Sequence, residues 1–153
     1  MSTAENEDVL DLFDQAWKRL QRRMDGISDP EWGWRPAEIE AEISIRWRLE
    51  HITDLLAEPR NWTWLGLPVP EAQGAAGAAR SAASACSSMA AAYELFRGSL
   101  SDGSVNFDAE VGPAAGPFAS ATRRSFVLHI ADELIHHGAE AALLRDLYAA
   151  QSR

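Results

Sequence analysis

The stretch that decides the fold is FVLHIADELIHHGAEAALLRDLYAA, which covers residues 126–150. On a helical wheel, at about 100° per residue, six of its apolar side chains fall within one arc about 80° wide. The members of that arc are Phe126, Ile130, Leu134, Ala141, Leu144 and Tyr148. This periodicity predicts a long amphipathic helix, which we expect to run from about residue 119 to residue 150.

Three more segments have helical periodicity or helical composition, whereas the sustained alternation typical of strands is not found. The first follows a Ser2-x-x-Glu5 capping pattern, and the second begins at about Ile39 or at Ser44. The third is rich in alanine, which is a strong helix former. We predict these three helices over residues 5–24, 42–57 and 75–97.

Glycine and proline gather between the predicted helices. They interrupt residues 28–36 (SDPEWGWRP) and 98–117, which are predicted loops, while Pro59 either ends the second helix or opens a short turn. Connections of this length fit an all-α four-helix bundle with long crossover loops, formed as a single domain over residues 1–153. We expect its core to contain Leu49, Ile52, Leu56, Phe126, Ile130, Leu134 and Leu144.

The composition excludes several kinds of site and partner. Cys86 is the only cysteine, so an internal disulfide and a thiolate metal cluster are excluded, and a metal would need His, Asp or Glu ligands. The formal net charge of −9 repels phosphate backbones, and the basic pairs at 22–23 and 123–124 are too short to form a basic stripe. Nucleic acid is therefore not expected as a partner.

Targeting signals are also not found. No apolar run approaches the roughly 18 residues that a membrane span requires, so no membrane association is expected. Residues 1–8 are polar and acidic, whereas a secretory signal has a basic start followed by an apolar stretch. We expect a cytoplasmic protein.

The apolar arc of the last helix also contains ionisable side chains. His137 lies in its middle, Glu133 and Glu140 lie within about 60° of His137, and His129 comes one turn before Glu133. A carboxylate on a buried face costs several kcal/mol unless it is paired, protonated or bound to a cation. Because Glu133 and His137 are spaced i, i+4, their side chains are close enough to bind one metal ion.

The second helix offers a third ligand. His51 lies where its apolar and solvated arcs meet, a position that suits a ligand in a crevice between helices. Together with Glu133 and His137 it makes a set of two histidines and one glutamate, which leaves one metal position open for water or substrate. Arg48 lies in the apolar arc about 60° away. It either clamps a carboxylate ligand or cofactor near the metal, or lies along the apolar surface with its guanidinium in water.

Simpler interpretations stay open at this point. Glu133 and His137 can form a mere ion pair, and His51 can be an ordinary core histidine. Asp132 and His136 form a second i, i+4 pair, but it is displaced by about 100° toward the edge of the stripe. Cys86 is most simply a small buried residue. The tryptophans at 32, 34, 47, 62 and 64 are predicted packing and loop anchors, of which a few can line the crevice.

HIADELIHHGAEAALLRDLY (129–148), with SIRWRLEHITDLL (44–56), resembles the DinB/YfiT-like family of four-helix metalloproteins. Members commonly have one His on the second helix and a His-x3-His motif on the last. Here His51 and His137 match the outer positions, and Glu133 replaces the first His of the motif, so His136 is not a ligand. This variant is similar to the mycothiol-dependent branch typified by maleylpyruvate isomerase.

The resemblance implies zinc or nickel as the metal, frequent dimers, and transfer or isomerisation chemistry with a low-molecular-weight thiol. The chain has one lysine and thirteen arginines and is rich in alanine, as in actinobacteria, whose thiol is mycothiol. The apolar aromatic residues outnumber what so small a bundle readily buries, which also favours a homodimer.

Two classes of function are compatible with these residues. In the first, an enzyme uses the metal to activate a small thiol toward a small electrophilic substrate, with Glu140 and His129 supporting the ligands or moving protons and Arg48 as a clamp. A hydrolase that uses metal-bound hydroxide is a variant of this site. In the second, a non-catalytic metal-binding or stress-associated module fills the crevice with side chains.

Overall fold

The computed structural model describes residues 3–37, 40, 42–71 and 77–151, and helices dominate this part of the chain. The helices are α1 (Thr3–Met24), α2 (Asp29–Gly33), α3 (Ile45–Ala57), α4 (Arg60–Leu65), α5 (Ala82–Ser101), the 3-10 helix η1 (Pro113–Phe118) and α6 (Arg123–Gln151). Over the described ranges there is no strand, only an isolated bridge between Glu110 and Thr122. The all-α prediction is confirmed.

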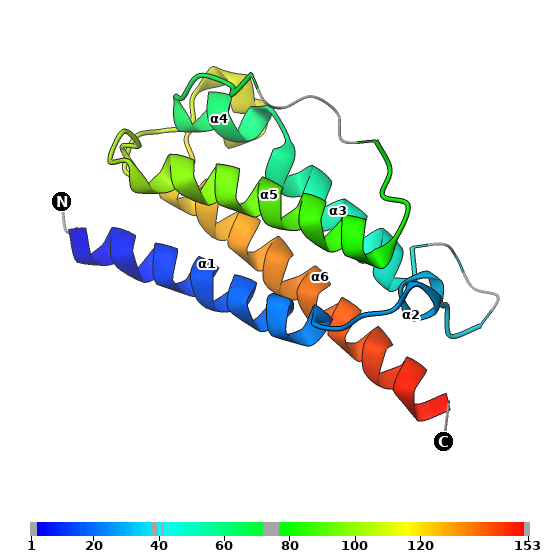
Figure 1. Ribbon diagram of the computed structural model, residues 1–153. Coiled ribbons are helices and arrows are strands. Elements are labelled where there is room, and N and C mark those ends of the chain that lie inside the picture. Colours follow the sequence, from blue (N-terminus) through cyan, green and yellow to red (C-terminus); the bar gives the residue numbers. More distant parts are fainter. Residues whose placement is uncertain (1–2, 38–39, 41, 72–76, 152–153) are drawn as a thin grey trace.

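The four long helices α1, α3, α5 and α6 form the bundle (Figure 1). Helices α1 and α6 run in one direction and α3 and α5 in the other, so the order along the chain is up, down, down, up. Helix α3 packs against both α5 and α6, and α1 packs against α6. Because α4 lies at one end of the bundle and α5 begins at the other, the connection between them is a crossover along its length.

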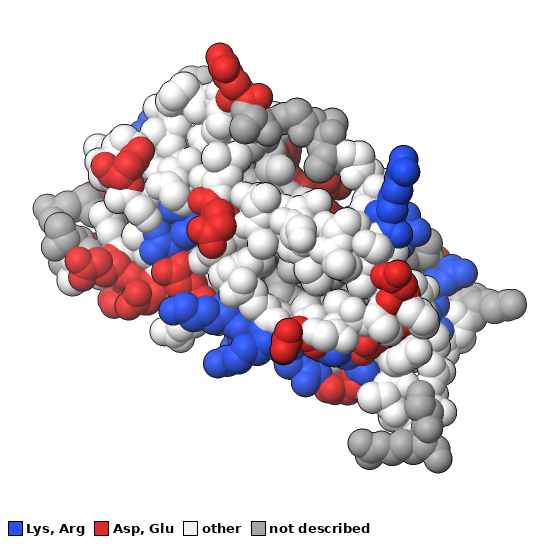
Figure 2. Space-filling view, viewed as in Figure 1, with Lys and Arg blue, Asp and Glu red and all other residues white. Residues whose placement is uncertain are grey.

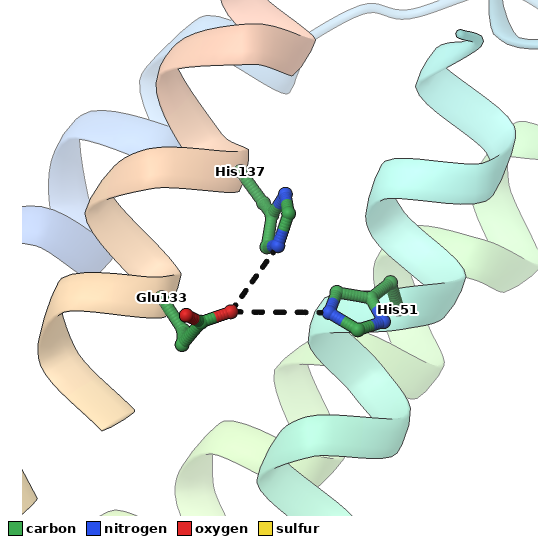
Figure 3. A group of neighbouring side chains, drawn as sticks. All are labelled: His51, Glu133 and His137. Atoms are coloured by element: carbon green, nitrogen blue, oxygen red, sulfur yellow. Dashed lines mark ion pairs between the residues drawn. The ribbon is translucent and has the colours of Figure 1, made fainter. Parts of the chain in front are cut away.

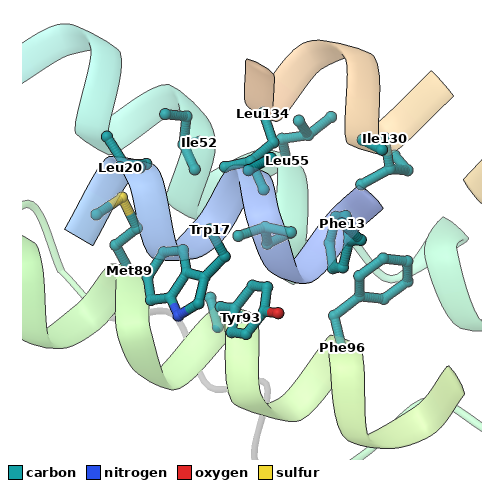
Figure 4. Close-up of a cluster of buried hydrophobic side chains, with 14 of the residues drawn as sticks. Phe13, Trp17, Leu20, Ile52, Leu55, Met89, Tyr93, Phe96, Ile130 and Leu134 are labelled. Carbon is teal, nitrogen blue, oxygen red and sulfur yellow. The ribbon is translucent and has the colours of Figure 1, made fainter. Parts of the chain in front are cut away.

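Large aromatic rings fill the space between α1 and α5 (Figure 4). The Trp17 and Tyr93 rings stack with centroids 4.2 Å apart, and Phe13 packs edge-on against Phe96 at 5.8 Å. Branched aliphatic residues of α3 and α6 complete this core. All the predicted core residues are buried: Leu49, Ile52, Leu56, Phe126, Ile130, Leu134 and Leu144.

Serine side chains determine where two of the helices begin. The Ser44 hydroxyl accepts a hydrogen bond from the Trp47 amide at 3.1 Å, so α3 begins at residue 45, which confirms the Ser44 start and shortens the predicted 42–57 helix. The loop predicted at residues 28–36 contains α2, because Ser28 and Glu31 form a capping box. Pro30 was expected to stop a helix, but in the first turn it favours one.

The third helix is displaced from its predicted range of 75–97. Residues 77–81 are not helical, and α5 begins after Ser81, whose hydroxyl accepts from the Ser84 amide; residues 75 and 76 lie outside the described part. The helix continues past Gly98 to Ser101, because Leu100 is buried in the core and packing outweighs the low helix propensity of glycine. The predicted 98–117 loop is therefore shorter at both ends, since η1 begins at Pro113.

Helices α1 and α6 differ from prediction only at their ends. Helix α1 begins at Thr3 rather than residue 5, while the proposed cap, Ser2, lies outside the described residues. Helix α6 begins at Arg123 rather than near residue 119, because the backbone before it pairs with the preceding loop. The Val111 amide donates to Ala121 at 2.8 Å and the Arg123 amide to Ala109 at 2.9 Å. These bonds compete with the first helical turn.

Many of the charged side chains of one face lie along α1, with acidic groups toward its N-terminal end and groups of both signs farther along, and a broad uncharged area covers α5 (Figure 2). This face has no continuous basic stripe, and the expectation that nucleic acid is not a partner stays a prediction. Within the described ranges, none of the helices is both long enough and apolar enough to span a bilayer.

Candidate metal centre

The three predicted ligands meet between α3 and α6 (Figure 3). Glu133 and His137 come from successive turns of α6, and His51 faces them from α3. The Oε2 atom of Glu133 lies 3.3 Å from Nε2 of His137 and 4.0 Å from Nε2 of His51. The structure therefore brings together the three residues that the sequence singled out.

The donor set fits a divalent cation. In a tetrahedral site with metal–ligand distances of about 2.1 Å, neighbouring donors lie about 3.4 Å apart, close to the 3.3 and 4.0 Å separations here. Two imidazoles and one carboxylate suit zinc and nickel. In the described part of the chain, no fourth His, Cys, Asp or Glu side chain joins this group, so a position stays free for an exogenous ligand.

Glu140 determines which nitrogen of His137 is available. Its Oε2 atom lies 2.8 Å from Nδ1 of His137. Burial raises the pKa of Glu140, but the hydrogen bonds with the two histidines and the charge of Arg48 outweigh it and lower the pKa overall. Because an ionised carboxylate can only accept a hydrogen bond, this contact favours the His137 tautomer with its proton on Nδ1, in which the Nε2 lone pair is directed at Glu133 and His51.

Arg48 is paired within the chain. Its Nε atom lies 3.0 Å from Oε2 of Glu140, and its guanidinium lies 4.7 Å from the centroid of the Trp47 ring. Only 16% of the side chain is exposed, so the alternative of a guanidinium in water is wrong. The carboxylate that Arg48 clamps is that of Glu140, and the predicted contact with a bound ligand or cofactor stays untested.

Trp47 supports the other side of the centre. Its ring stacks on His51 with the planes 8° apart and the centroids 4.7 Å apart, and it lies edge-on to His137 at 6.0 Å. Burial and the neighbouring His137 lower the pKa of His51, which favours the neutral imidazole that a metal requires. Trp47 belongs to the tryptophans predicted as packing and loop anchors, of which a few can line the crevice, and its i, i+4 spacing from His51 is the sequence signal that places it at the site.

The two remaining histidines of α6 lie outside the ligand set. His136 is 56% exposed, and its Nε2 atom lies 3.0 Å from Oε1 of Glu140. It forms a second candidate group with His137 and Glu140, but the Arg48 guanidinium 3.5 Å from Nδ1 of His137 disfavours a second cation there. His129 is exposed and lies on the wall of the adjoining pocket rather than against the ligands.

The centre opens on one side. A pocket of about 360 Å³ is lined by both His51 and Glu133, together with Asp54, Leu55, Glu58, Arg60 and His129. The exposed fraction of the ligand side chains falls from 38% for His51 through 26% for Glu133 to 11% for His137. The side of the donor set that faces the pocket is therefore that of His51 and Glu133, and His137 lies on the side of the core. Arg60 also lines this pocket but was not among the predicted site residues. The only feature of the sequence that could have drawn attention to it is its position directly after Pro59, which interrupts the helix.

Cys86 and the tryptophans other than Trp47 lie outside this ligand group. Cys86 is half-buried, and burial raises the pKa of its thiol, as expected for an unreactive residue. Trp32 and Trp62 are buried in the core, and Trp34 packs edge-on against Tyr148 at 5.6 Å. Trp64 packs against Phe126 at 4.9 Å, near the start of α6. Most of the tryptophans are therefore packing residues, as predicted.

The comparisons with known proteins agree with this architecture. The model of the DinB superfamily matches residues 12–141, which include the second half of α1, all of α3 and α5, and all three candidate ligands. A search of curated proteins finds no match, and a search of solved structures finds none either. A match over most of the length, together with a four-helix bundle and a His/Glu centre between α3 and α6, assigns the family: the chain belongs to the DinB superfamily.

Proposed function

We propose that this protein is a metal-dependent enzyme that transfers a low-molecular-weight thiol to a small electrophile, or isomerises such a substrate with the thiol's help. The observation that carries the proposal is the open donor set: His51, Glu133 and His137 converge, the first two also line a pocket, and no further His, Cys, Asp or Glu side chain of the described residues completes the set. A module that holds a metal only for structure needs no such opening.

A divalent cation held by these three side chains would lower the pKa of a coordinated thiol, so that the thiolate is available near neutral pH. The chain's own residues supply the rest. Glu140 orients His137, and Arg48 holds Glu140 in place at 3.0 Å. His129, on the pocket wall, accepts the proton that the thiol loses. In a transfer reaction the sulfur then bonds to the electrophilic carbon, and the leaving group departs with its electron pair.

The choice of thiol and metal belongs to the same proposal. Glu133 stands at the position that is glutamate in the mycothiol-dependent branch and histidine in most members, which supports mycothiol as the thiol. Zinc suits the two-histidine, one-carboxylate set with an open position, and nickel is the alternative.

The test is a thiol-transfer assay on protein of known metal content, with monobromobimane as electrophile and with or without mycothiol. We expect turnover above the uncatalysed rate only when metal and thiol are both present. His137→Ala should lose it, while His136→Ala, which alters an exposed neighbour, should retain it. Metal-dependent ester hydrolysis without any thiol effect would favour the hydrolase, and metal binding without either activity would favour the non-catalytic module.

We also propose a homodimer, although the expected reason needs correction. All six tryptophans are buried or half-buried, and Phe118 is the one aromatic side chain among the strongly exposed apolar residues that the structure describes, at 64% exposed. A surplus of exposed aromatic rings therefore does not favour a dimer. Exposed leucines of α6 offer an apolar surface instead, with Leu143 59% and Leu147 43% exposed. Sedimentation equilibrium at micromolar concentration should give twice the mass of the chain, and a monomer would refute this assembly.

A further inference from the structure

We infer that a second, apolar pocket beside the metal centre binds an aromatic or branched aliphatic group of the electrophile. This inference rests on the proposed function, because it names the class of substrate that reaches the same centre. The pocket is lined by residues of α4, η1 and the start of α6 together with Val111 and Ala121, and Figure 1 shows these three elements at the same end of the bundle. Its volume of about 290 Å³ is enough for one phenyl ring and a short linker.

Apolar side chains make up most of the pocket wall. Trp64 of α4, Phe118 of η1 and Phe126 of α6 contribute rings, and Val111 and Ala121 contribute aliphatic surface. Phe118 is 64% exposed, so this ring forms an open wall rather than part of the core. A cavity lined mainly by aromatic and aliphatic side chains with a few polar groups is typical of a small-molecule site.

The apolar pocket adjoins the pocket of the metal centre. Arg60 and His129 line both, so the two cavities share one boundary. Along α6, Ser125 lines the apolar pocket and His129 the boundary, four residues before the ligand Glu133. Four residues of helix rise about 6 Å, so the apolar group lies one to two turns from the reacting end. A substrate that spans both cavities needs a linker of a few bonds.

Arg60 gives the boundary its polarity. Its Nε atom pairs with Glu58 at 2.9 Å, and its guanidinium lies over the Trp64 ring, 5.2 Å from the centroid. A guanidinium has five N–H donors, and this ion pair engages it through Nε, so the others can donate to an acceptor on the linker. The geometry therefore favours an electrophile with a carbonyl or similar acceptor between its apolar group and its reactive end.

A series of metal-binding probes tests the inference. Acetohydroxamate and 3-phenylpropionohydroxamate bear the same metal-binding group, and only the second bears a phenyl ring on a short linker. On zinc-loaded protein, calorimetry should show the phenyl compound binding about tenfold more tightly or better, because the ring leaves water. Equal affinities, with acetohydroxamate bound, would overturn the inference and leave the proposed function intact.

Variants of the pocket wall test whether the higher affinity of the phenyl compound comes from this pocket. Ser125 is exposed at the start of α6 and lines the pocket, so Ser125→Trp should fill the cavity and remove most of the phenyl advantage while acetohydroxamate binds unchanged. Ser125→Ala is the matched control and should keep the advantage. Phe118→Ala should reduce it, whereas Leu143→Ala, which removes a similarly exposed apolar side chain elsewhere on the bundle, should not. Retention of the full advantage in Ser125→Trp would overturn the assignment.

A metal-free experiment separates the two proposals. Protein labelled with 5-fluorotryptophan is titrated with 3-phenylpropanol, and the Trp64 fluorine resonance, assigned with Trp64→Phe, should shift to saturation in the parent but not in Ser125→Trp. Saturation in protein that binds neither zinc nor acetohydroxamate would refute the proposed function and leave an apolar site. If 3-phenylpropanol does not bind and Phe118→Ala converts a dimer into a monomer, this surface is a contact between subunits. That result would overturn the inference.

Discussion

Two carboxylates inside the bundle have opposite surroundings. Between α1 and α5, Asp14 accepts hydrogen bonds from Nε and Nη2 of Arg97, at 2.6 and 2.9 Å, and from the Tyr93 hydroxyl. Burial raises the pKa of Asp14, but these partners outweigh it and lower the pKa overall. Between α3 and α6, Glu133 faces two imidazole nitrogens and, among the described residues, forms no ion pair with Arg or Lys.

This difference indicates what each site is for. The chain supplies a guanidinium to Asp14 and another, Arg48, to Glu140, so both carboxylates are neutralised internally. It supplies none to Glu133, although Arg48 is nearby. A partly buried carboxylate without a paired guanidinium or ammonium group lacks a compensating positive charge, which a bound cation would provide. The surroundings of Asp14 therefore suit a role in stabilising the fold, and those of Glu133 suit the binding of a cation.

Removal of a ligand that the cation requires should have the largest effect. His137→Ala leaves two ligands, which hold zinc poorly, so we expect the affinity to fall about 1,000-fold or more, measured by competition with a chromogenic chelator. His136→Ala is the matched control, because that ring is exposed and outside the set. A His137→Ala protein that binds zinc as tightly as the parent would show that the ligand set is wrong.

Glu133→Gln tests the charge alone. The amide keeps the shape of the side chain but loses the negative charge that a cation neutralises, so zinc affinity should fall about 100-fold. The metal-free variant should be as stable as the parent or slightly more so in urea unfolding, because an uncompensated charge is gone. Asp132→Asn, which removes an exposed charge from the adjacent position, should change neither quantity. Unchanged affinity in Glu133→Gln would refute the comparison.

Asp14→Asn should behave in the reverse manner. It leaves Arg97 without its carboxylate, so we expect a loss of about 2 kcal/mol in the free energy of unfolding and unchanged zinc affinity. The exposed Asp11→Asn on the same helix is the control. Because the folded pKa of Asp14 lies below its ordinary value of 3.8, the parent's advantage should be constant near neutral pH and shrink as the pH falls through that folded value. An advantage that persists at lower pH would contradict this.

The smallest expected effect concerns the orientation of a ligand. Glu140→Gln removes the charge that holds the Nδ1 proton of His137 and pairs with Arg48, so zinc affinity should fall about tenfold. The loss should persist when His136→Ala is added, because the 3.0 Å contact of His136 is not the one that orients the ligand. If His136→Ala alone reproduced the loss, the role assigned to His137 in this pair would be wrong.

Periodicity predicted the elements whose pattern is intrinsic to the sequence. The apolar stripe of α6 fixed both its buried face and the central position of His137, and the border position of His51 matches its half-buried state. Helix ends were less predictable. The start of α6 depends on hydrogen bonds to residues 107–111, and the start of α5 on a serine pair within an alanine-rich run. Both helix starts depend on hydrogen-bond partners, and helical periodicity does not indicate which partners lie close in space.

The same limit applies to the site. Glu133 and His137 are four residues apart on one helix, so their proximity could be predicted from the sequence. The partners of Arg48 could not be predicted, because its choice of Glu140 over a bound ligand depends on how α3 and α6 pack. The pocket of Trp64 and Phe118 was missed for a related reason: its walls come from α4, η1 and α6, which are distant in the sequence.

Because Trp47 stacks on His51, metal binding at the centre can be followed by tryptophan fluorescence. An indole 4.7 Å from one candidate ligand and 6.0 Å from another lies within a few ångströms of any ion that the set binds. An open-shell ion such as Co²⁺ or Ni²⁺ would quench its emission by contact and energy transfer, whereas Zn²⁺, with a filled d shell, would change mainly the intensity set by the stacked imidazole. The protein therefore contains its own fluorophore for counting ions and distinguishing their electronic class.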